Sequence, residues 1–374
     1  MSGDSPDLSV AASASGDAQF MAHALQLARR GLFTADPNPR VGCVIVKDGQ
    51  VVGAGWHERA GQAHAEIRAL KAAGERARGA TAYVTLEPCC HQGRTPPCTR
   101  ALIEAGVARV VAAMADPNPQ VAGKGMEALR QARIGVDTGL MQTQAEALNP
   151  GFISRMRRGR PYVLAKLAVS LDGRTALADG ASRWITGAAA RADVQALRAR
   201  SSAIVTGIGS VLADDPSLNV REFDIGRQPL RVVVDSTLRM PPTAKMLSLP
   251  GSTLIVTARQ HADDADRLLA AGAEVLYLPA ADGSVDLPGL MGHLAAREVN
   301  DLMVEAGARL CGALLAAELI DEIVIYYAPH ILGSTAHGMF AMPGLENMQQ
   351  RQALKIQDVR AIGDDWRVTA RVVS

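Results

Sequence analysis

The sequence has little of what marks a protein that binds nucleic acid or crosses a membrane. Its 39 lysines and arginines are balanced by 38 aspartates and glutamates over 374 residues. Only 3% of residues are aromatic, whereas proteins that hold single-stranded nucleic acid use basic grooves with aromatic side chains. No apolar run is long enough to cross a bilayer. These deficits favour a small-molecule substrate, with no nucleic-acid and no membrane partner.

The first residues also lack the features of a secretory signal. Up to about Asp17 they are small, polar and slightly acidic, with neither a basic nor an apolar stretch. We expect residues 1–17 to form a disordered tail. We also expect a cytoplasmic protein.

The length favours two domains, because it exceeds that of one ordinary core. A basic segment at 154–161 ends in Gly and Pro and predicts a linker. The expected domains are therefore residues 18–155 and 160–374. Strands alternate with helices in both, which predicts an α/β fold.

Particular elements can be placed within each expected domain. The first should contain helices over 19–31, 64–73 and 99–105, a hairpin turning at Asp48-Gly49, and strands over 82–86 and 109–114. The second should contain about eight strands, with helices over 188–200 and 311–319.

Cysteine is scarce, and three of the five cysteines, Cys89, Cys90 and Cys98, lie within ten residues. In a reducing compartment such a cluster indicates metal binding or catalysis before a disulfide. Catalytic zinc takes three protein ligands and keeps one position for water. One imidazole from His64 and two thiolates meet that requirement. Glu66 would then lie near the metal and pass a proton from water to a leaving amine, as in zinc deaminases.

Other assignments of this cluster stay open. A fourth ligand from His91 or Cys90 would close a structural zinc site, in which a carboxylate two residues after the histidine has no purpose. Cys90 is an alternative to Cys89, and His57 is an alternative histidine without the following carboxylate. Cys43 lies in an apolar strand and is expected to be core.

Around this cluster the sequence resembles one family. Eight residues separate Cys89 from Cys98, where the usual deaminase signature has two. The insert HQGRTPP, with TLEP before it, resembles the bifunctional riboflavin-biosynthesis deaminase/reductases, as do PNPRVG and DPNPQVAGKG. That family deaminates a diaminopyrimidinone ribosylamino phosphate and then reduces its ribose to ribitol. It has Ser-His where this chain has Cys90 and His91, and a second His at Gln92.

The resemblance implies a cytidine-deaminase-like three-layer domain with one Zn²⁺ per chain, held by the three ligands named above, and Glu66 as the catalytic proton shuttle. It also implies that Asn38 and His91 face the pyrimidine. An Asn amide can donate to and accept from a pyrimidine edge. Asn38 also has a simpler interpretation, as a turn residue between two prolines.

The second half lacks a complete GxGxxG fingerprint, because Leu212 stands where TGIGSVL (206–212) would need its third glycine. By itself this segment is as compatible with an ordinary strand-to-helix turn as with dinucleotide binding. Five segments nevertheless match the reductase half of the same family in order: 166–174, 181–187, 209–221, 233–236 and 304–315. The resemblance covers residues 19–374. It implies a dihydrofolate-reductase-like α/β domain and hydride transfer from NADPH to the ribosyl carbon.

The same resemblance implies the residues of the second site. Those for the substrate are Lys166, Ser182, Arg198, Leu218, Arg221 and Glu305. Those for NADPH are Ala168, Trp184, Ser210, Asp214, Ser236, Gly307, Ala308, Arg309, Leu310, Cys311, Gly312 and Ala313. The family often has Gly-Pro after this glutamate, whereas this chain has Ala306-Gly307-Ala308.

Physical chemistry agrees with these roles but leaves alternatives. The guanidinium groups of Arg198 and Arg221 could each bind a phosphate through two hydrogen bonds, although either residue could be an ordinary surface arginine. A lysine inside an apolar strand favours a site role over a snorkelling edge residue. The glycine-flanked turn would bring N–H groups at a helix N-terminus to the pyrophosphate. Trp184 could instead be core.

Two other functions compete with this interpretation. A deaminase acting on tRNA, with an inactive or divergent second domain, shares the zinc chemistry but predicts a basic, aromatic surface. A non-enzymatic zinc protein predicts loss of Glu66 or of a ligand. We expect both reactions in one chain, with deamination first, and a homo-oligomer, a dimer or higher.

Overall fold

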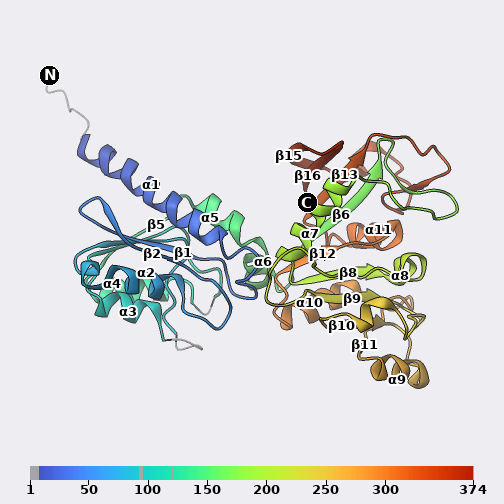
Figure 1. Cartoon of the computed structure of the whole chain (residues 1–374), viewed down its shortest axis with the longest axis horizontal. Coiled ribbons are helices and arrows are strands. Elements are labelled where there is room, and N and C mark those ends of the chain that lie inside the picture. The colour runs from blue at the N-terminus through green and yellow to red at the C-terminus, as the bar shows by residue number, and fades with distance from the viewer. Residues whose placement is uncertain (1–7, 92–95, 120, 374) are drawn as a thin grey trace. The chain divides into compact units, whose positions relative to one another are not determined.

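The computed structural model describes residues 8–91, 96–119 and 121–373 and divides between Arg158 and Gly159 into two compact units (Figure 1). This division falls inside the segment expected to be a linker. The first part of that segment is not a linker but the end of a helix, α6 (Pro150–Arg158). Among the described residues, no helix combines the length and hydropathy needed to span a membrane.

The first unit contains a five-stranded sheet in the order β2-β1-β3-β4-β5. Its strands are β1 (Gly42–Lys47), β2 (Gln50–Trp56), β3 (Thr81–Val84), β4 (Arg109–Ala112) and β5 (Gly135–Thr138). Its helices are α1 (Leu8–Arg29), α2 (Ala65–Ala73), η1 (Gly74–Ala77), α3 (Cys98–Glu104), α4 (Lys124–Gln131), α5 (Gln142–Leu148) and α6. β1 is antiparallel to β2 and β3, whereas β3, β4 and β5 are parallel.

Alternation along β1 produces the three layers that the resemblance implied. Cys43 and Ile45 pack with α2, α3 and α4 on one face, and Val44 packs with α1 and α5 on the other (Figure 1). Cys43 is fully buried, which confirms its expected core role. Gly42 lets α1 approach closely, because a Cβ there would lie 2.0 Å from the Ala24 carbonyl oxygen.

The expected tail is wrong from Leu8 onward, because α1 begins there, and residues 1–7 lie outside the described part. Asp17 is not free. It accepts a 2.5 Å hydrogen bond from the Tyr83 hydroxyl and pairs with Arg109 at 2.8 Å. The Ala-rich sequence before it is compatible with a helix, and composition alone could not show these partners.

The second unit contains a nine-stranded sheet in the order β11-β10-β9-β8-β12-β6-β13-β16-β15. Its strands are β6 (Tyr162–Ser170), β8 (Ala203–Gly207), β9 (Leu230–Val234), β10 (Thr253–Thr257), β11 (Glu274–Tyr277), β12 (Asp301–Val304), β13 (Glu322–Ala328), β15 (Leu354–Ile362) and β16 (Asp365–Val372). The short strands β7 (Arg174–Ala176) and β14 (His337–Gly338) form a separate pair. Helical elements are α7 (Ala188–Arg200), α8 (Ile208–Asp214), η2 (Lys245–Ser248), α9 (Ala262–Ala270), α10 (Leu287–Ala296), α11 (Ala308–Ala316) and η3 (Met348–Gln350).

Seven strands of this sheet run parallel, and β16 and β15 complete it with antiparallel pairing. Val163 packs with α10 and α11 on one face, and Leu164 packs with α7, α8 and α9 on the other. All eight expected strands are present. β15 was missed because its alternation of apolar and polar residues shifts at Gln357 and Asp358, where its pairing with β16 is irregular.

Candidate active sites

Three separate elements of the first unit bring the expected zinc ligands together. His64 caps the N-terminus of α2, Cys98 is the first residue of α3, and Cys89 follows β3. Nδ1 of His64 lies 3.3 Å from Sγ of Cys98 and 3.6 Å from Sγ of Cys89, and all three ligand atoms lie within 4.8 Å of one another. Tetrahedral zinc with nitrogen and sulfur ligands needs spacings of about 3.5–3.8 Å, so the three residues fit zinc.

Electrostatics around the three ligands suit a metal site. Hydrogen bonds from Cys98 and from His64 lower the pKa of Cys89, which favours its thiolate. Glu66 lies in the first turn of α2 and is buried, and this burial raises its pKa to about 7. The carboxylate is in hydrogen-bond contact with Cys98 and is not one of the three ligands.

The alternative histidine, His57, has a different position. Its Nε2 lies 3.0 Å from the Asn38 amide nitrogen and its Nδ1 lies 3.3 Å from the Ala63 carbonyl oxygen. Burial lowers the pKa of His57, so the neutral ring donates to Ala63 and accepts from Asn38. Its edge packs against His64, with ring centroids 5.4 Å apart. His57 therefore supports His64 and orients Asn38, a role that the sequence gave no signal for.

The structure also places the other residues that the sequence suggested near this cluster. Asn38 closes a turn, because its N–H donates to the Ala35 carbonyl, and its side chain also reaches His57. Cys90 is half-buried and does not belong to the ligand group of the described residues. His91 is exposed and lies two residues after Cys89, and Gln92 lies outside the described residues.

The second unit contains a cavity of about 1850 Å³, onto which the ends of β8, β9 and β12 open. Most residues expected to bind substrate or cofactor line it, from Lys166 and Ser182 to Ser236 and Glu305. Cys311 and Gly312 do not, because α11 turns them away. Cys311 is buried in the core, and Gly312 packs against Ala341, whose carbonyl oxygen would lie 2.2 Å from an added Cβ.

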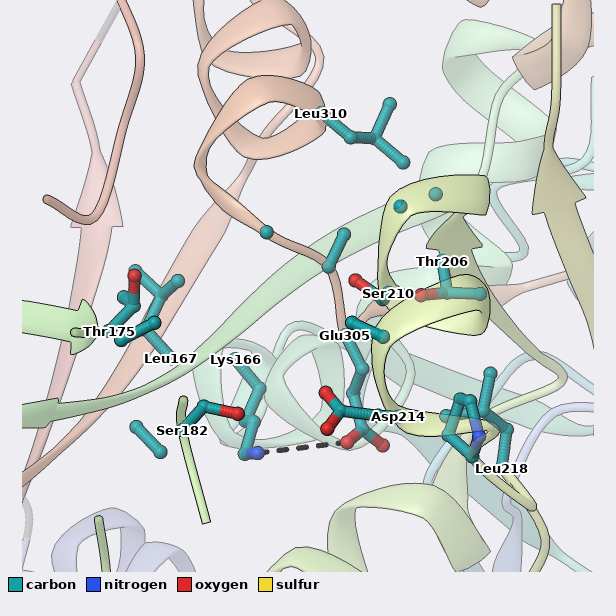
Figure 2. Close-up of a pocket in the computed structure, with 18 of the residues that line it drawn as sticks. Lys166, Leu167, Thr175, Ser182, Thr206, Ser210, Asp214, Leu218, Glu305 and Leu310 are labelled. Atoms are coloured by element: carbon teal, nitrogen blue, oxygen red, sulfur yellow. Dashed lines mark ion pairs between the residues drawn. The ribbon is translucent and has the colours of Figure 1, made fainter. Parts of the chain in front are cut away.

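A charged group of three residues lies inside this cavity, and Figure 2 shows Lys166 and Glu305 pointing toward each other. Nζ of Lys166 lies 3.6 Å from Oε2 of Glu305, and Nε of Arg198 lies 2.5 Å from Oε1. Burial by itself would raise the pKa of Glu305, but the charges of Arg198 and Lys166 outweigh it and lower this pKa to about 2. Lys166 is therefore a cavity residue held by an ion pair and not a snorkelling edge residue.

The two expected phosphate arginines differ in their partners. Nε and one terminal nitrogen of Arg198 already hold both oxygens of Glu305, so the bidentate face expected for phosphate is engaged by a carboxylate. Arg221 is exposed, lines the cavity and donates to the nearby Asn219 side chain. Of the two, Arg221 has the geometry that leaves donors for a phosphate.

Trp184 is not core, because 70% of it is exposed and it lines the cavity. The guanidinium carbons of Arg191 and Arg183 lie 4.7 and 5.8 Å from its ring centroid. Arg183 in turn pairs with Asp214 at 3.1 Å. The sequence did not single out these two arginines, although both are close to Trp184 along the chain.

Two helix N-termini converge beside this group. The segment at 206–212 is a strand-to-helix turn from β8 into α8, with Gly207 as the N-cap, and Gly307 is the N-cap of α11. Added Cβ atoms at Gly207 and Gly307 would lie only 3.7 Å from Leu310 and 4.0 Å from the Ser210 hydroxyl. The two turns thus lie next to each other, which fits a dinucleotide held by backbone N–H groups.

Comparison with known proteins agrees with both sites. The family model described as RibD C-terminal domain matches residues 161–368, and that of the cytidine and deoxycytidylate deaminase zinc-binding region matches residues 14–114. The riboflavin biosynthesis protein RibD of Escherichia coli (strain K12) is 51% identical over 361 residues, covering 93% of this chain and 97% of that protein.

This chain belongs to the RibD family.

Solved structures agree with this assignment. The RibD of Acinetobacter baumannii (form 2) is 46% identical with a TM-score of 0.89, covering 96% of this chain and all of that one. A Thermotoga maritima diaminohydroxyphosphoribosylaminopyrimidine deaminase/5-amino-6-(5-phosphoribosylamino)uracil reductase is 30% identical with a TM-score of 0.85 and the same coverage. The chain is therefore a bifunctional deaminase and reductase of riboflavin biosynthesis, with zinc and NADPH as cofactors.

Replacing Cys89 and Cys90 one at a time should show which of the two cysteines binds zinc. We expect Cys90→Ser to keep about one zinc per chain and Cys89→Ser to lose it on dialysis, because only Cys89 belongs to the ligand group. Elemental analysis of the dialysed proteins measures this. Zinc loss from Cys90→Ser with retention in Cys89→Ser would reverse the assignment.

The ion pairs of Glu305 should make the second unit sensitive to acid. Its folded pKa of about 2 lies below the unfolded value of about 4.3. The carboxylate therefore stabilises the folded state fully above pH 4.3, and this stabilisation is lost as the pH falls toward 2. Relative to Glu305→Gln, wild type should lose about 2 kcal/mol of unfolding free energy between pH 7 and pH 3.

Urea unfolding at each pH measures that difference. Glu346→Gln is the matched control, because Glu346 is exposed on the same unit and its replacement should leave the pH dependence of wild type unchanged. A constant difference between wild type and Glu305→Gln down to pH 3 would contradict the assigned pKa.

Proposed function

We propose that the chain hydrolytically deaminates 2,5-diamino-6-ribosylamino-4(3H)-pyrimidinone 5′-phosphate and then reduces the ribosyl chain of the product to ribityl with NADPH. We assign the first reaction to residues 18–155 and the second to residues 160–374. The observation that carries the proposal is that one chain of this family has the His64, Cys89 and Cys98 cluster with Glu66 beside it, and a separate cavity lined by the expected reductase residues.

In the deaminase site, bound zinc would supply an activated water. Glu66 is placed beside the ligands to take a proton from that water and to return it to the leaving amine, so that ammonia departs and a carbonyl remains. Asn38 would hold the pyrimidine edge with the amide that His57 orients. His91, which is exposed, would contact the same ring.

In the reductase site, bound NADPH would supply the hydride. Lys166 is paired with Glu305 inside the cavity and would hydrogen-bond the ring oxygen of the ribosyl group. As the ribosyl carbon accepts the hydride, its bond to that oxygen would break, and the oxygen would take a proton to become a hydroxyl of the ribityl chain. Arg221 would hold the phosphate, with Ser182 and Leu218 lining the same cavity. Asp214, Ser236 and the turn that begins at Gly307 would contact the cofactor.

The alternative, a deaminase acting on nucleic acid with an inactive second domain, is disfavoured by this second cavity. Its lysine, glutamate and arginine are assembled in ion pairs at the positions expected for a reductase. A remnant domain has no need to maintain three charged groups that are mostly removed from water.

The deciding experiment uses Glu66→Gln with each of two substrates. With the diamino substrate, we expect wild type to release ammonia and then oxidise NADPH, and the variant to do neither. With the already deaminated substrate, both proteins should oxidise NADPH equally, because the second cavity is untouched. Ammonia and NADPH are measured in one assay, with zinc content as a check on the variant.

Two outcomes would contradict the proposal. Unchanged ammonia release by Glu66→Gln would show that Glu66 is not the proton shuttle. If wild type oxidised NADPH with the diamino substrate and released no ammonia, reduction would precede deamination, which contradicts the proposed order.

We also propose that the enzyme is a homodimer working in the reducing cytoplasm, where the thiolates of Cys89 and Cys98 stay reduced. The hairpin of β15 and β16 supports the dimer, because β15 is the edge strand and leaves apolar side chains exposed. Ile356 is 63% exposed and Trp366 is 54% exposed.

Charge on this hairpin should separate the subunits. We expect Ile356→Glu to sediment as a monomer and Lys355→Glu, its exposed neighbour on the same strand, to sediment as wild type. Analytical ultracentrifugation measures this. A monomeric wild type would contradict the proposed dimer, and an unchanged Ile356→Glu dimer would move the interface elsewhere.

A further inference from the structure

Glu87 is a buried carboxylate, only 3% exposed, in the loop that leads from β3 to Cys89. It accepts four backbone hydrogen bonds. Oε2 accepts from the N–H groups of Asp116 and Gly123 at 3.0 Å each, and Oε1 accepts from those of Gly125 and Met126 at 2.9 and 3.2 Å. Four N–H donors compensate for the loss of water around such a charge.

Three of the four donors belong to the two ends of the DPNPQVAGKG motif, residues 116–125, and Met126 directly follows it. Gly123 is the N-cap of α4 and makes no side-chain cap of its own, so Glu87 supplies the acceptor that the first turn of this helix needs. Asp116 belongs to the other end, four residues beyond the end of β4. One side chain therefore fixes the start and the finish of this segment.

The same segment is packed against the loop that carries the zinc ligand. An added Cβ at Gly125 would lie 2.1 Å from the Pro88 carbonyl oxygen, so only glycine fits there. The Glu87 N–H donates to Met114 at 3.0 Å. The two residues before Cys89 are thus joined both to the segment that follows β4 and to α4.

Asp116 lies within the electrostatic reach of the candidate deaminase site. Burial raises its pKa to about 6, the charges of Glu87 and Cys89 also raise it, and that of His91 lowers it. Its Oδ1 accepts from the Asn118 N–H at 2.8 Å. Asp116 is therefore held both by Glu87, which lies two residues before Cys89, and by the turn at Asn118.

We infer that Glu87 is a positioning residue of the deaminase reaction, whose carboxylate locks Asp116 and the start of α4 against the loop that carries Cys89. This inference rests on the proposed deaminase function. Glu87 acts through the segment it holds and makes no contact with the reacting atoms. The role is distinct from helix capping for stability, because one carboxylate joins the cap of α4 to the loop of a metal ligand.

The test replaces Glu87 by Gln, which keeps the shape but presents an amide group to two of the four N–H donors. We expect kcat/KM for ammonia release, per zinc-loaded chain, to fall about 10- to 100-fold. Oxidation of NADPH with the deaminated substrate should not change, since the second unit of the same chain is untouched. Hydrogen exchange should accelerate at the amides of Asp116, Gly123, Gly125 and Met126.

Asp17→Asn is the matched control. Asp17 is a carboxylate bound to Arg109 at the opposite end of β4 from Met114, so its replacement should destabilise the same unit without moving the segment. Its kcat/KM per zinc-loaded chain should equal that of wild type at a temperature where both are folded. This comparison separates positioning from stability.

Three results decide between the possibilities. If Glu87→Gln only lowers the melting temperature, as Asp17→Asn does, with unchanged kcat/KM per zinc, the inference is overturned. Unchanged exchange at the four amides would overturn it as well. If wild type itself released no ammonia, the proposed function would fail, and the inference would fail with it.

Discussion

A carboxylate removed from water is stable only when cations or hydrogen-bond donors surround it, and both sites of this protein are organised around such groups. In the second unit Glu305 is held by Arg198 and Lys166. In the first, Glu87 is held by four backbone N–H groups. The groups that stabilise each carboxylate are in turn held in position by their hydrogen bonds or ion pairs with it. The positions of Lys166 and of the segment from Asp116 follow from that constraint.

Close packing of layers supplies the rigid frame for these groups. Gly42 and Gly53 allow α1 and α2 to lie directly on the sheet, because added Cβ atoms there would meet carbonyl oxygens at 2.0 and 2.2 Å. His64 begins α2 and Cys98 begins α3, so these helices place two ligands on the same side of the sheet. The spacing of the ligands is thus set by helix packing and not by the loops alone.

The sequence motifs selected residues that mostly line the second cavity, but they did not predict all the partners of those residues. Arg198 was expected to grip a phosphate, and in the structure its paired donors hold Glu305. Trp184 lies on the cavity surface between two arginines, and a single tryptophan in a loop does not reveal that. His57, Arg183 and Arg191 had no motif of their own, because their roles arise only from contacts with residues that the motifs did identify.

From the sequence by itself we could predict the zinc-binding residues, the residue that would carry a proton, the alternation of strands with helices, and the succession of two units. Short-range spacing and residue type carry that information, because a ligand set or a strand pattern is a local property. Only the tertiary structure decided that Leu8 to Asp17 continue a helix, that β15 extends the sheet edge, and that Glu87 holds a segment up to 39 residues away. These depend on partners distant in the chain, which enter through folding and leave no mark on local sequence.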